Sequence, residues 1–179
     1  MELPREMPEL TAERGYRLRG WREADTELLR EAAADPYIPL ITTVPAPYGE
    51  AAAAVFLERQ WRRTEIGTGY PFVLVDPEGR PVGHVGLWVA DLALRGYAST
   101  GYWLAPSARG RGAAGIGLRA VTRWAREELG IARLELHVEP WNTASLRTAE
   151  RSGYRRAELR PAHQQVGGEP RDMWRYVGP

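Results

Sequence analysis

Residues 107–117 read SARGRGAAGIG, with four glycines in eleven positions. Glycine destabilises a regular element by roughly 0.5–1 kcal/mol relative to alanine. Concentrating it here therefore indicates a backbone that needs unusual conformations or a surface free of side chains. The residues before it, Ser99 to Ala105, have a strand pattern. Those after it place Ala114, Leu118, Val121, Ala125 and Leu129 near one helical face. The stretch is therefore predicted to be a turn from a strand into a helix.

Such a turn is suited to binding an anion. The first N–H groups of a helix have no partner inside it, and the helix dipole adds partial positive charge there. Glycine lets the backbone approach a phosphate closely, and Arg109 and Arg111 add charge nearby. The sequence predicts a phosphate or pyrophosphate site at this turn. A plain strand-to-helix connection in a glycine- and arginine-rich chain is the alternative.

The same residues are not a dinucleotide-binding fingerprint. Gly110, Gly112 and Gly115 fit the spacing GxGxxG, but they lie two-thirds of the way along the chain. No βαβ unit surrounds them, and Glu127 and Glu128 fall inside the following helix, where they could not contact a ribose. The match is interpreted as accidental.

Composition excludes several classes of chemistry. The chain has no cysteine, so thiolate nucleophiles, disulfides and zinc–thiolate sites are excluded. It also has no lysine, which excludes a Schiff base and a Walker-A loop. The three histidines are far apart in sequence, so no metal site is expected. A net charge of +1 from scattered arginines gives no reason to expect nucleic acid. No apolar run spans a membrane and no signal peptide is evident, so a cytoplasmic protein is expected.

The pattern of elements predicts one α/β (α+β) domain over residues 1–179, with residues 1–10 as a loose lead-in. A strand at 15–21 precedes helices at 24–34 and 50–64, which are joined by a proline-rich loop. Strands follow at 71–76, 81–90 and 99–105, then the helix after the glycine turn. A strand at 132–139, a helix at 142–152 and two final strands complete the order β-α-α-β-β-β-α-β-α-β-β. This order predicts a mixed sheet with helices packed on it.

Two blocks of this chain resemble the GNAT superfamily of acyl-CoA-dependent N-acetyltransferases. GYWLAPSARGRGAA resembles the family's strand-loop-helix block, with Arg109 to Ala114 at its core. RLELHVEPWNTASLRTAERSGY resembles its second block, with Asn142, Ser145 and Gly153-Tyr154 at the matching places. GYWLAP and the serine three residues after the asparagine are similar to the RimJ/RimL branch, the ribosomal-protein N-terminal acetyltransferases. The resemblance covers most of residues 15–177 and implies a GNAT fold, a mixed, mostly antiparallel sheet with helices on both faces.

The resemblance also implies site residues. Backbone N–H groups of Arg109, Gly110, Arg111, Gly112, Ala113 and Ala114 would hold the CoA pyrophosphate. The backbone of Trp103, Leu104 and Ala105 would pair with the pantetheine arm, and an N–H near Leu104 would polarise the thioester carbonyl. Asn142 would help to hold the pantetheine. Many relatives have a tyrosine seven residues after this asparagine as the general acid toward the CoA sulfur; that position is Ala149 here, and the resemblance implies that Ser145, near the sulfur, is its substitute.

Both residues of the second block also have structural interpretations. Asparagine is among the best helix N-caps, so Asn142 is expected to combine capping with binding. Ser145 could simply satisfy the first helical turn. The departing thiol ionises near pH 8.5, so a missing proton donor is tolerable.

The base that takes the amine proton is left open by the sequence. Many relatives carry a glutamate at the start of the GYWLAP strand, whereas this chain has Ala98-Ser99-Thr100. His84 shares a strand face with Val82, Gly86 and Trp88 and could relay a proton, or could be a hydrogen-bonded core residue. His137 and Glu135 are further candidates, as are a water molecule and an amine that arrives neutral.

The sequence therefore predicts an N-acetyltransferase that moves the acetyl group from acetyl-CoA directly to a peptide N-terminus or a small-molecule amine. No metal cofactor is expected, and a homodimer is compatible with the sequence. Acceptor specificity is assigned to the first two helices, their loop and the last hairpin. A catalytically silent acyl-CoA sensor is the main alternative, motivated by the missing glutamate and tyrosine. A nucleotide-binding module unrelated to CoA is the third.

Overall fold

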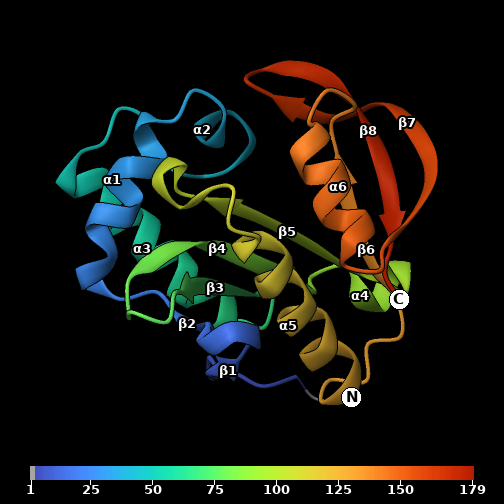
Figure 1. Ribbon diagram of the computed structural model, residues 1–179, viewed down its shortest axis with the longest axis horizontal. Coiled ribbons are helices and arrows are strands. Elements are labelled where there is room, and N and C mark those ends of the chain that lie inside the picture. Colours follow the sequence, from blue (N-terminus) through green and yellow to red (C-terminus); the bar gives the residue numbers. More distant parts are fainter. Residues whose placement is uncertain (1–2) are drawn as a thin grey trace.

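The computed structural model describes residues 3–179 and contains one eight-stranded sheet in the order β1-β2-β3-β4-β5-β6-β8-β7 (Figure 1). The strands are β1 (Leu10–Thr11), β2 (Arg17–Gly20), β3 (Gly69–Val75), β4 (Pro81–Trp88), β5 (Ala98–Leu104), β6 (Leu134–Val138), β7 (Arg155–Val166) and β8 (Glu169–Val177). Every neighbouring pair in this sheet is antiparallel except β5 and β6. The predicted mixed, mostly antiparallel sheet is confirmed.

The helices follow the predicted order with two additions. They are α1 (Thr26–Ala34), α2 (Ile38–Ile41), α3 (Glu50–Glu65), α4 (Leu92–Arg95), α5 (Ala113–Glu127) and α6 (Thr143–Arg151). The short helices α2 and α4 were not predicted: α2 begins in the proline-rich loop, and α4 follows strand β4. Pro39 lies in the first turn of α2, where its missing N–H is not needed.

The lead-in is more ordered than expected. Leu10 and Thr11 form β1 by pairing with β2, and the Tyr70 hydroxyl donates a hydrogen bond to the carbonyl of Pro4 at 2.8 Å. Residues 1 and 2 of the predicted lead-in lie outside the described residues. This segment, which has little sequence pattern, is thus fixed by contacts with β2 and β3 that the local sequence does not reveal.

Helices cover both faces of the sheet, as predicted (Figure 1). Strand β3 shows why, because its alternate side chains belong to two separate cores. Phe72 and Leu74 pack in the core of α5 and α6, whereas Val73 packs in the core of α1 and α3. A strand buried on both faces reads as a continuous apolar run, and this one reads PFVLV.

The sheet opens between β5 and β6. These strands run parallel and pair only at Ala98↔Leu134 and Ser99↔Glu135. Beyond Ser99 each strand continues without a further pair to the other, so the two diverge. On the far side, the β7–β8 hairpin reaches α2, where the Gly167 N–H donates to the Leu40 carbonyl at 3.1 Å. The opening is therefore bordered by elements from both ends of the chain.

Candidate active site

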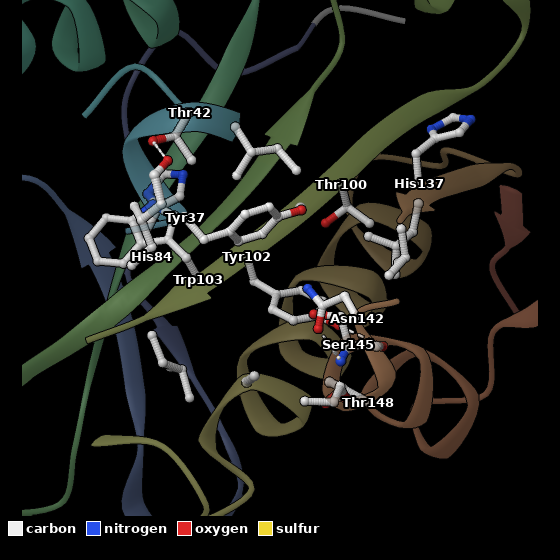
Figure 2. A pocket seen from close by; sticks show the side chains of 18 of the residues that line it. Tyr37, Thr42, His84, Thr100, Tyr102, Trp103, His137, Asn142, Ser145 and Thr148 are labelled. Atoms are coloured by element: carbon white, nitrogen blue, oxygen red, sulfur yellow. Dashed lines mark hydrogen bonds between the residues drawn. The ribbon is translucent and has the colours of Figure 1, made fainter. Parts of the chain in front are cut away.

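A cleft of about 1360 Å³ occupies the opening between β5 and β6. Its walls come from the segment before and within α2, from α3, β4, β5, the glycine turn, β6, α6 and the hairpin. Figure 2 shows His84 and Trp103 on one side of it and Asn142, Ser145 and Thr148 on the α6 side. The cleft brings together both sequence blocks that carried the family resemblance.

The glycines between 107 and 117 serve two different purposes. Gly110 and Gly112 have φ of +81° and +78°, in the left-handed region that L side chains rarely adopt. Gly117 lies inside α5, where a Cβ would come within 2.8 Å of the Val85 side chain on β4. The first two glycines shape the turn, and the last lets the helix approach the sheet.

The turn leaves backbone donors available at the start of α5. Gly112 is the N-cap, no side chain caps the helix, and the first helical bond runs from the Ile116 N–H to the Gly112 carbonyl. The N–H groups of the first turn therefore have no partner inside the helix. A Cβ built on Gly110 or Gly112 would meet nothing within 4 Å. Open space and unpaired donors are the features that a diphosphate requires.

The side chain of Arg109 does not lie free at this turn. One of its terminal nitrogens donates to Asp35 at 2.8 Å and to the Leu104 carbonyl at 3.3 Å. Asp35 is buried and also accepts the N–H groups of Tyr37 and Ile38. Burial alone would raise the pKa of Asp35, but these hydrogen bonds and the Arg109 charge hold it below its usual value. This guanidinium, which was expected to add positive charge near a phosphate, is thus paired with a buried carboxylate.

The register of β5 decides which backbone groups face the opening. Ala105 donates its N–H to Val82 on β4 at 3.0 Å, and hydrogen-bonded pairs alternate along an antiparallel ladder. Trp103 and Ala105 therefore direct their polar groups toward β4. Tyr102 and Leu104 direct theirs toward the opening. Of the three residues expected to pair with pantetheine, Leu104 has this orientation; Tyr102, which was not among the three, has it as well.

Asn142 caps α6 as predicted, because its Oδ1 accepts the Ser145 N–H at 3.1 Å. The Ser145 carbonyl accepts the Tyr102 hydroxyl at 3.1 Å, which joins β5 to α6 across the cleft. Burial raises the pKa of Tyr102 to about 12, so its phenol stays protonated. The sequence shows a tyrosine in the strand, but only the fold places it against α6.

His84 occupies an aromatic cluster. Its Nδ1 accepts the Trp21 indole N–H at 3.3 Å, and its ring stacks on Trp103 with centroids 5.8 Å apart. Burial, together with the charge of Arg63, lowers the pKa of His84 to about 3. A neutral imidazole whose basic nitrogen already accepts a hydrogen bond is a weak proton acceptor. The environment therefore favours the core interpretation of His84 over the catalytic one.

The other two candidate bases, Glu135 and His137, are also in contact with neighbouring side chains that make them less suited to accept a proton. Glu135 is fully buried and is bonded to the guanidinium groups of Arg133 and Arg175. His137 lines the cleft with its ring 4.3 Å from that of His163. Burial and the neighbouring His163 lower the pKa of His137 to about 4. Glu135 is held by cations, and His137 is neutral at physiological pH.

A pair of residues that the sequence did not single out for catalysis lies in the cleft wall. Glu139, only 4% exposed, accepts the Tyr37 hydroxyl at 2.6 Å, and Arg171 lies 4.0 Å away. Burial and the Glu139 charge raise the pKa of Tyr37, so the phenol remains a donor. No local signal could have found this pair, because its members are 102 positions apart.

Comparison with known proteins assigns the fold and the family. The family model described as "Acetyltransferase (GNAT) domain" matches residues 16–155. This chain belongs to the GNAT acetyltransferases. Three solved structures share its fold. RimJ of Mycobacterium smegmatis in complex with CoA-disulfide is 23% identical, with a TM-score of 0.81 over 95% of this chain and 85% of that one.

The other two are more distant acetyltransferases. The ribosomal-protein-S5-alanine acetyltransferase of Vibrio fischeri is 14% identical, with a TM-score of 0.77 over 91% of this chain and 92% of that one. The spermidine N-acetyltransferase of Vibrio cholerae, in complex with CoA and spermine, is 16% identical, with a TM-score of 0.75 over 91% and 94%. At these identities the likeness concerns the fold.

The acetyltransferase uses acetyl-CoA as its cosubstrate. Its own residues fit that group: the turn at Gly110 and Gly112 offers open space and unpaired donors for a diphosphate, and the backbone of Leu104 faces the opening. Between residues 3 and 179 no three histidine, aspartate or glutamate side chains are grouped to hold a metal. Over the same residues no helix of the acetyltransferase has the length and apolarity that crossing a bilayer requires.

Proposed function

We propose that this acetyltransferase transfers the acetyl group directly from acetyl-CoA to the amine of a peptide N-terminus or a small molecule, with both bound in one cleft. The observation that supports this most is that two sets of backbone N–H groups lie in one cleft. The unpaired amides at the glycine turn and the Leu104 N–H line the same opening between diverging strands. With no cysteine in the chain, no thioester-linked enzyme intermediate is part of the proposal.

In this proposal the backbone binds the cosubstrate. Amides from Gly110 to Ala114 hold the diphosphate, whereas the expected Arg109 N–H already donates to the Pro106 carbonyl at 3.4 Å. Tyr102 and Leu104 pair with the pantetheine as an added strand would. The Leu104 N–H donates to the thioester oxygen, where negative charge develops, and such a donor is worth about 10²–10³ in rate. Asn142 and Ser145 border the pantetheine from the first turn of α6.

Acetyl-CoA supplies an activated acyl group with a good thiolate leaving group. An ammonium acceptor loses one proton before its nitrogen attacks the thioester carbon, and a second as the C–N bond forms and the C–S bond breaks. The second proton passes to the departing thiolate, so the chain must accept the first. His84, with its depressed pKa, does not suit that task. We assign it to Glu139, a carboxylate in the cleft wall whose bond to Tyr37 fixes its orientation. A carboxylate there can both attract an ammonium group and accept its proton.

The solved structures support two acceptor classes. The ribosomal-protein-S5-alanine acetyltransferase favours a protein acceptor, whereas the spermidine enzyme favours a small amine. We also propose membership of the RimJ/RimL branch, on the motifs GYWLAP and Asn142-x-x-Ser145. A silent acyl-CoA sensor remains the second candidate, because Ser99 and Ala149 stand where many relatives have a glutamate and a tyrosine.

The test combines binding and turnover. Calorimetry measures CoA affinity, and thiol release from acetyl-CoA is followed with peptides, polyamines and amino-acid derivatives. Turnover with any amine class supports the proposal. Tight CoA binding with no turnover supports the sensor. Absence of CoA binding contradicts both candidates, since each depends on the glycine turn.

A further inference from the structure

Helix α3 directs a stripe of three side chains into the cleft. Phe56, Gln60 and Arg63 follow the spacing i, i+4, i+7, which places them on one helical face, and all three line the cleft. Phe56 and Gln60 are buried, and Arg63 is half-buried. None of the three belongs to the cosubstrate turn or to the Glu139–Tyr37 pair.

Arg63 is held in place over an aromatic ring. Its guanidinium lies 4.6 Å from the centre of a Trp88 ring, and its Nη1 donates to Gln60 Oε1 at 2.9 Å. Trp88 itself lies close over two glycines, because a Cβ on Gly69 or on Gly86 would come within 2.4 Å of its indole. Glycines in the sheet thus make room for the tryptophan that supports the arginine.

This arrangement lies where the sheet opens. Trp88 pairs with Ser99 on β5, and Ser99 is the last β5 residue that pairs with β6. Trp88 also shares its sheet face with His84, which stacks on it with centroids 6.1 Å apart. Arg63 therefore borders the face of the cleft opposite α5 and α6, on the side away from the cosubstrate turn.

The charge of Arg63 is not balanced by an acidic side chain. Within residues 3–179 no carboxylate lies within 4.0 Å of it, whereas the cleft arginines Arg95, Arg109 and Arg119 each have one. The other cleft arginines without a carboxylate partner are exposed, but Arg63 is half-buried. Burial, and then the charge of Arg59, lower the pKa of Arg63. A partly desolvated guanidinium stacked on tryptophan and fixed by one amide is a good receptor for a carboxylate, which can accept two of its N–H groups.

We infer that Arg63, oriented by Gln60 and Trp88, binds a carboxylate of the acceptor. The substrate class is therefore an amine that also carries a carboxylate, such as an amino acid or an acidic derivative of one. This inference rests on the proposed function, since it concerns the acceptor side of the same cleft. It predicts that the cleft wall has two opposite charges: Glu139 binds the amine of the acceptor, and Arg63 binds its carboxylate.

The experiment compares matched acceptors in matched variants. Thiol release from acetyl-CoA is measured with a set of amino acids and with their carboxamides, which keep the amine and remove the acid. The variants are Arg63→Gln, Arg63→Lys and, as the control, Arg62→Gln at the adjacent exposed position. CoA affinity and circular dichroism confirm that each variant is folded.

We expect the native enzyme to prefer the acids. Arg63→Gln should lower kcat/KM for the acids by about tenfold or more, the size of a charged hydrogen bond, and change the amides by less than about twofold. Arg63→Lys should recover part of the loss, since it keeps the charge without the planar fork. Arg62→Gln should match the native enzyme.

Two results overturn the inference while leaving the proposed function intact: a native preference for amides, or an equal effect of Arg63→Gln on acids and amides. If no acceptor is acetylated, the proposed function fails. A binding measurement then tests separately whether Arg63 binds a carboxylate. The same acids and amides are then titrated into the CoA-saturated protein, followed by tryptophan fluorescence. Loss of acid binding in Arg63→Gln alone supports the subsite, and equal binding overturns it.

Discussion

Replacing Gly112 or Gly117 with alanine should separate cosubstrate binding from stability. Both glycines belong to the same stretch, but a methyl group meets different obstacles at the two positions. At Gly112 the backbone has φ of +78° and no atom lies within 4 Å of the new Cβ. At Gly117 the backbone is helical and the new Cβ would lie 2.8 Å from Val85 and 3.3 Å from Leu74.

The expected magnitudes follow from these geometries. An alanine forced to keep the left-handed conformation costs roughly 1–2 kcal/mol. The turn at Gly112 can avoid this by rotating, since nothing packs against it, and the amides at the start of α5 then turn away. Loss of one charged hydrogen bond, about 1.5–3 kcal/mol, weakens CoA binding roughly tenfold to a hundredfold.

At Gly117 the turn is untouched. Overpacking against β4 costs about 1–3 kcal/mol, and the better helix propensity of alanine offsets about 1 kcal/mol of it. A net loss of about 1 kcal/mol lowers the melting temperature by roughly 2–4 °C in a chain of this size.

Calorimetric titration with CoA and thermal melts of both variants measure the two effects. Gly112→Ala should weaken CoA binding with a small change in Tm, and Gly117→Ala should lower Tm while keeping native CoA affinity. Native affinity in Gly112→Ala, or weaker binding in Gly117→Ala than in Gly112→Ala, would refute the assignment of the diphosphate to this turn.

Three further predictions follow from single contacts. Glu139→Gln should lower kcat by about a hundredfold, the lower range for a general base, without changing CoA affinity; native turnover would exclude Glu139 from proton transfer. Asn142→Ala removes the cap bond to Ser145 and should lower the free energy of unfolding in urea by about 1 kcal/mol, and an unchanged midpoint would contradict the capping. Burial lowers the pKa of His84 from 6.5 in the unfolded chain to about 3 in the folded one. Between these values the unfolded state binds more protons, so the contribution of His84 makes the free energy of unfolding rise with pH. His84→Gln should flatten that rise in urea midpoints measured across it, and an unchanged slope would show that another group titrates.

The sequence predicted the parts of this site that depend on neighbours along the chain. A glycine turn before an amphipathic helix and an asparagine at the start of another are local signals, and the structure has a turn at Gly110–Gly112 and a cap at Asn142. Strand and helix order was equally accessible, because apolar periodicity reports which face of an element is buried. The short helices α2 and α4 were not predicted, because a single helical turn shows little apolar periodicity.

The sequence assigned acceptor specificity to the first two helices, their loop and the last hairpin, but the individual contacts of the proposed acceptor side could not be predicted, because they join distant segments. Tyr37 meets Glu139 across 102 residues, and Arg63 meets Trp88 only because α3 lies over β4. His84 illustrates the reverse case. The sequence showed that His84 lies on one face of an alternating strand. It did not show that the indole N–H of Trp21, 63 positions away, donates to its Nδ1. That contact favours the core interpretation of His84 over the catalytic one.

One interaction joins the glycine turn, which the sequence predicted, to the Tyr37–Glu139 pair, which it did not. Arg109, at the glycine turn, donates to one carboxylate oxygen of Asp35, and the other oxygen accepts the backbone N–H groups of Tyr37 and Ile38. Tyr37 in turn holds Glu139. A guanidinium that seemed from sequence to serve the phosphates instead connects the turn, by way of a buried carboxylate, to the residue assigned to proton transfer. Asp35 is buried and charged, so removing its cationic partner would leave that charge uncompensated. The conformation of the proposed acceptor wall is therefore energetically coupled to the turn that is proposed to bind the cosubstrate.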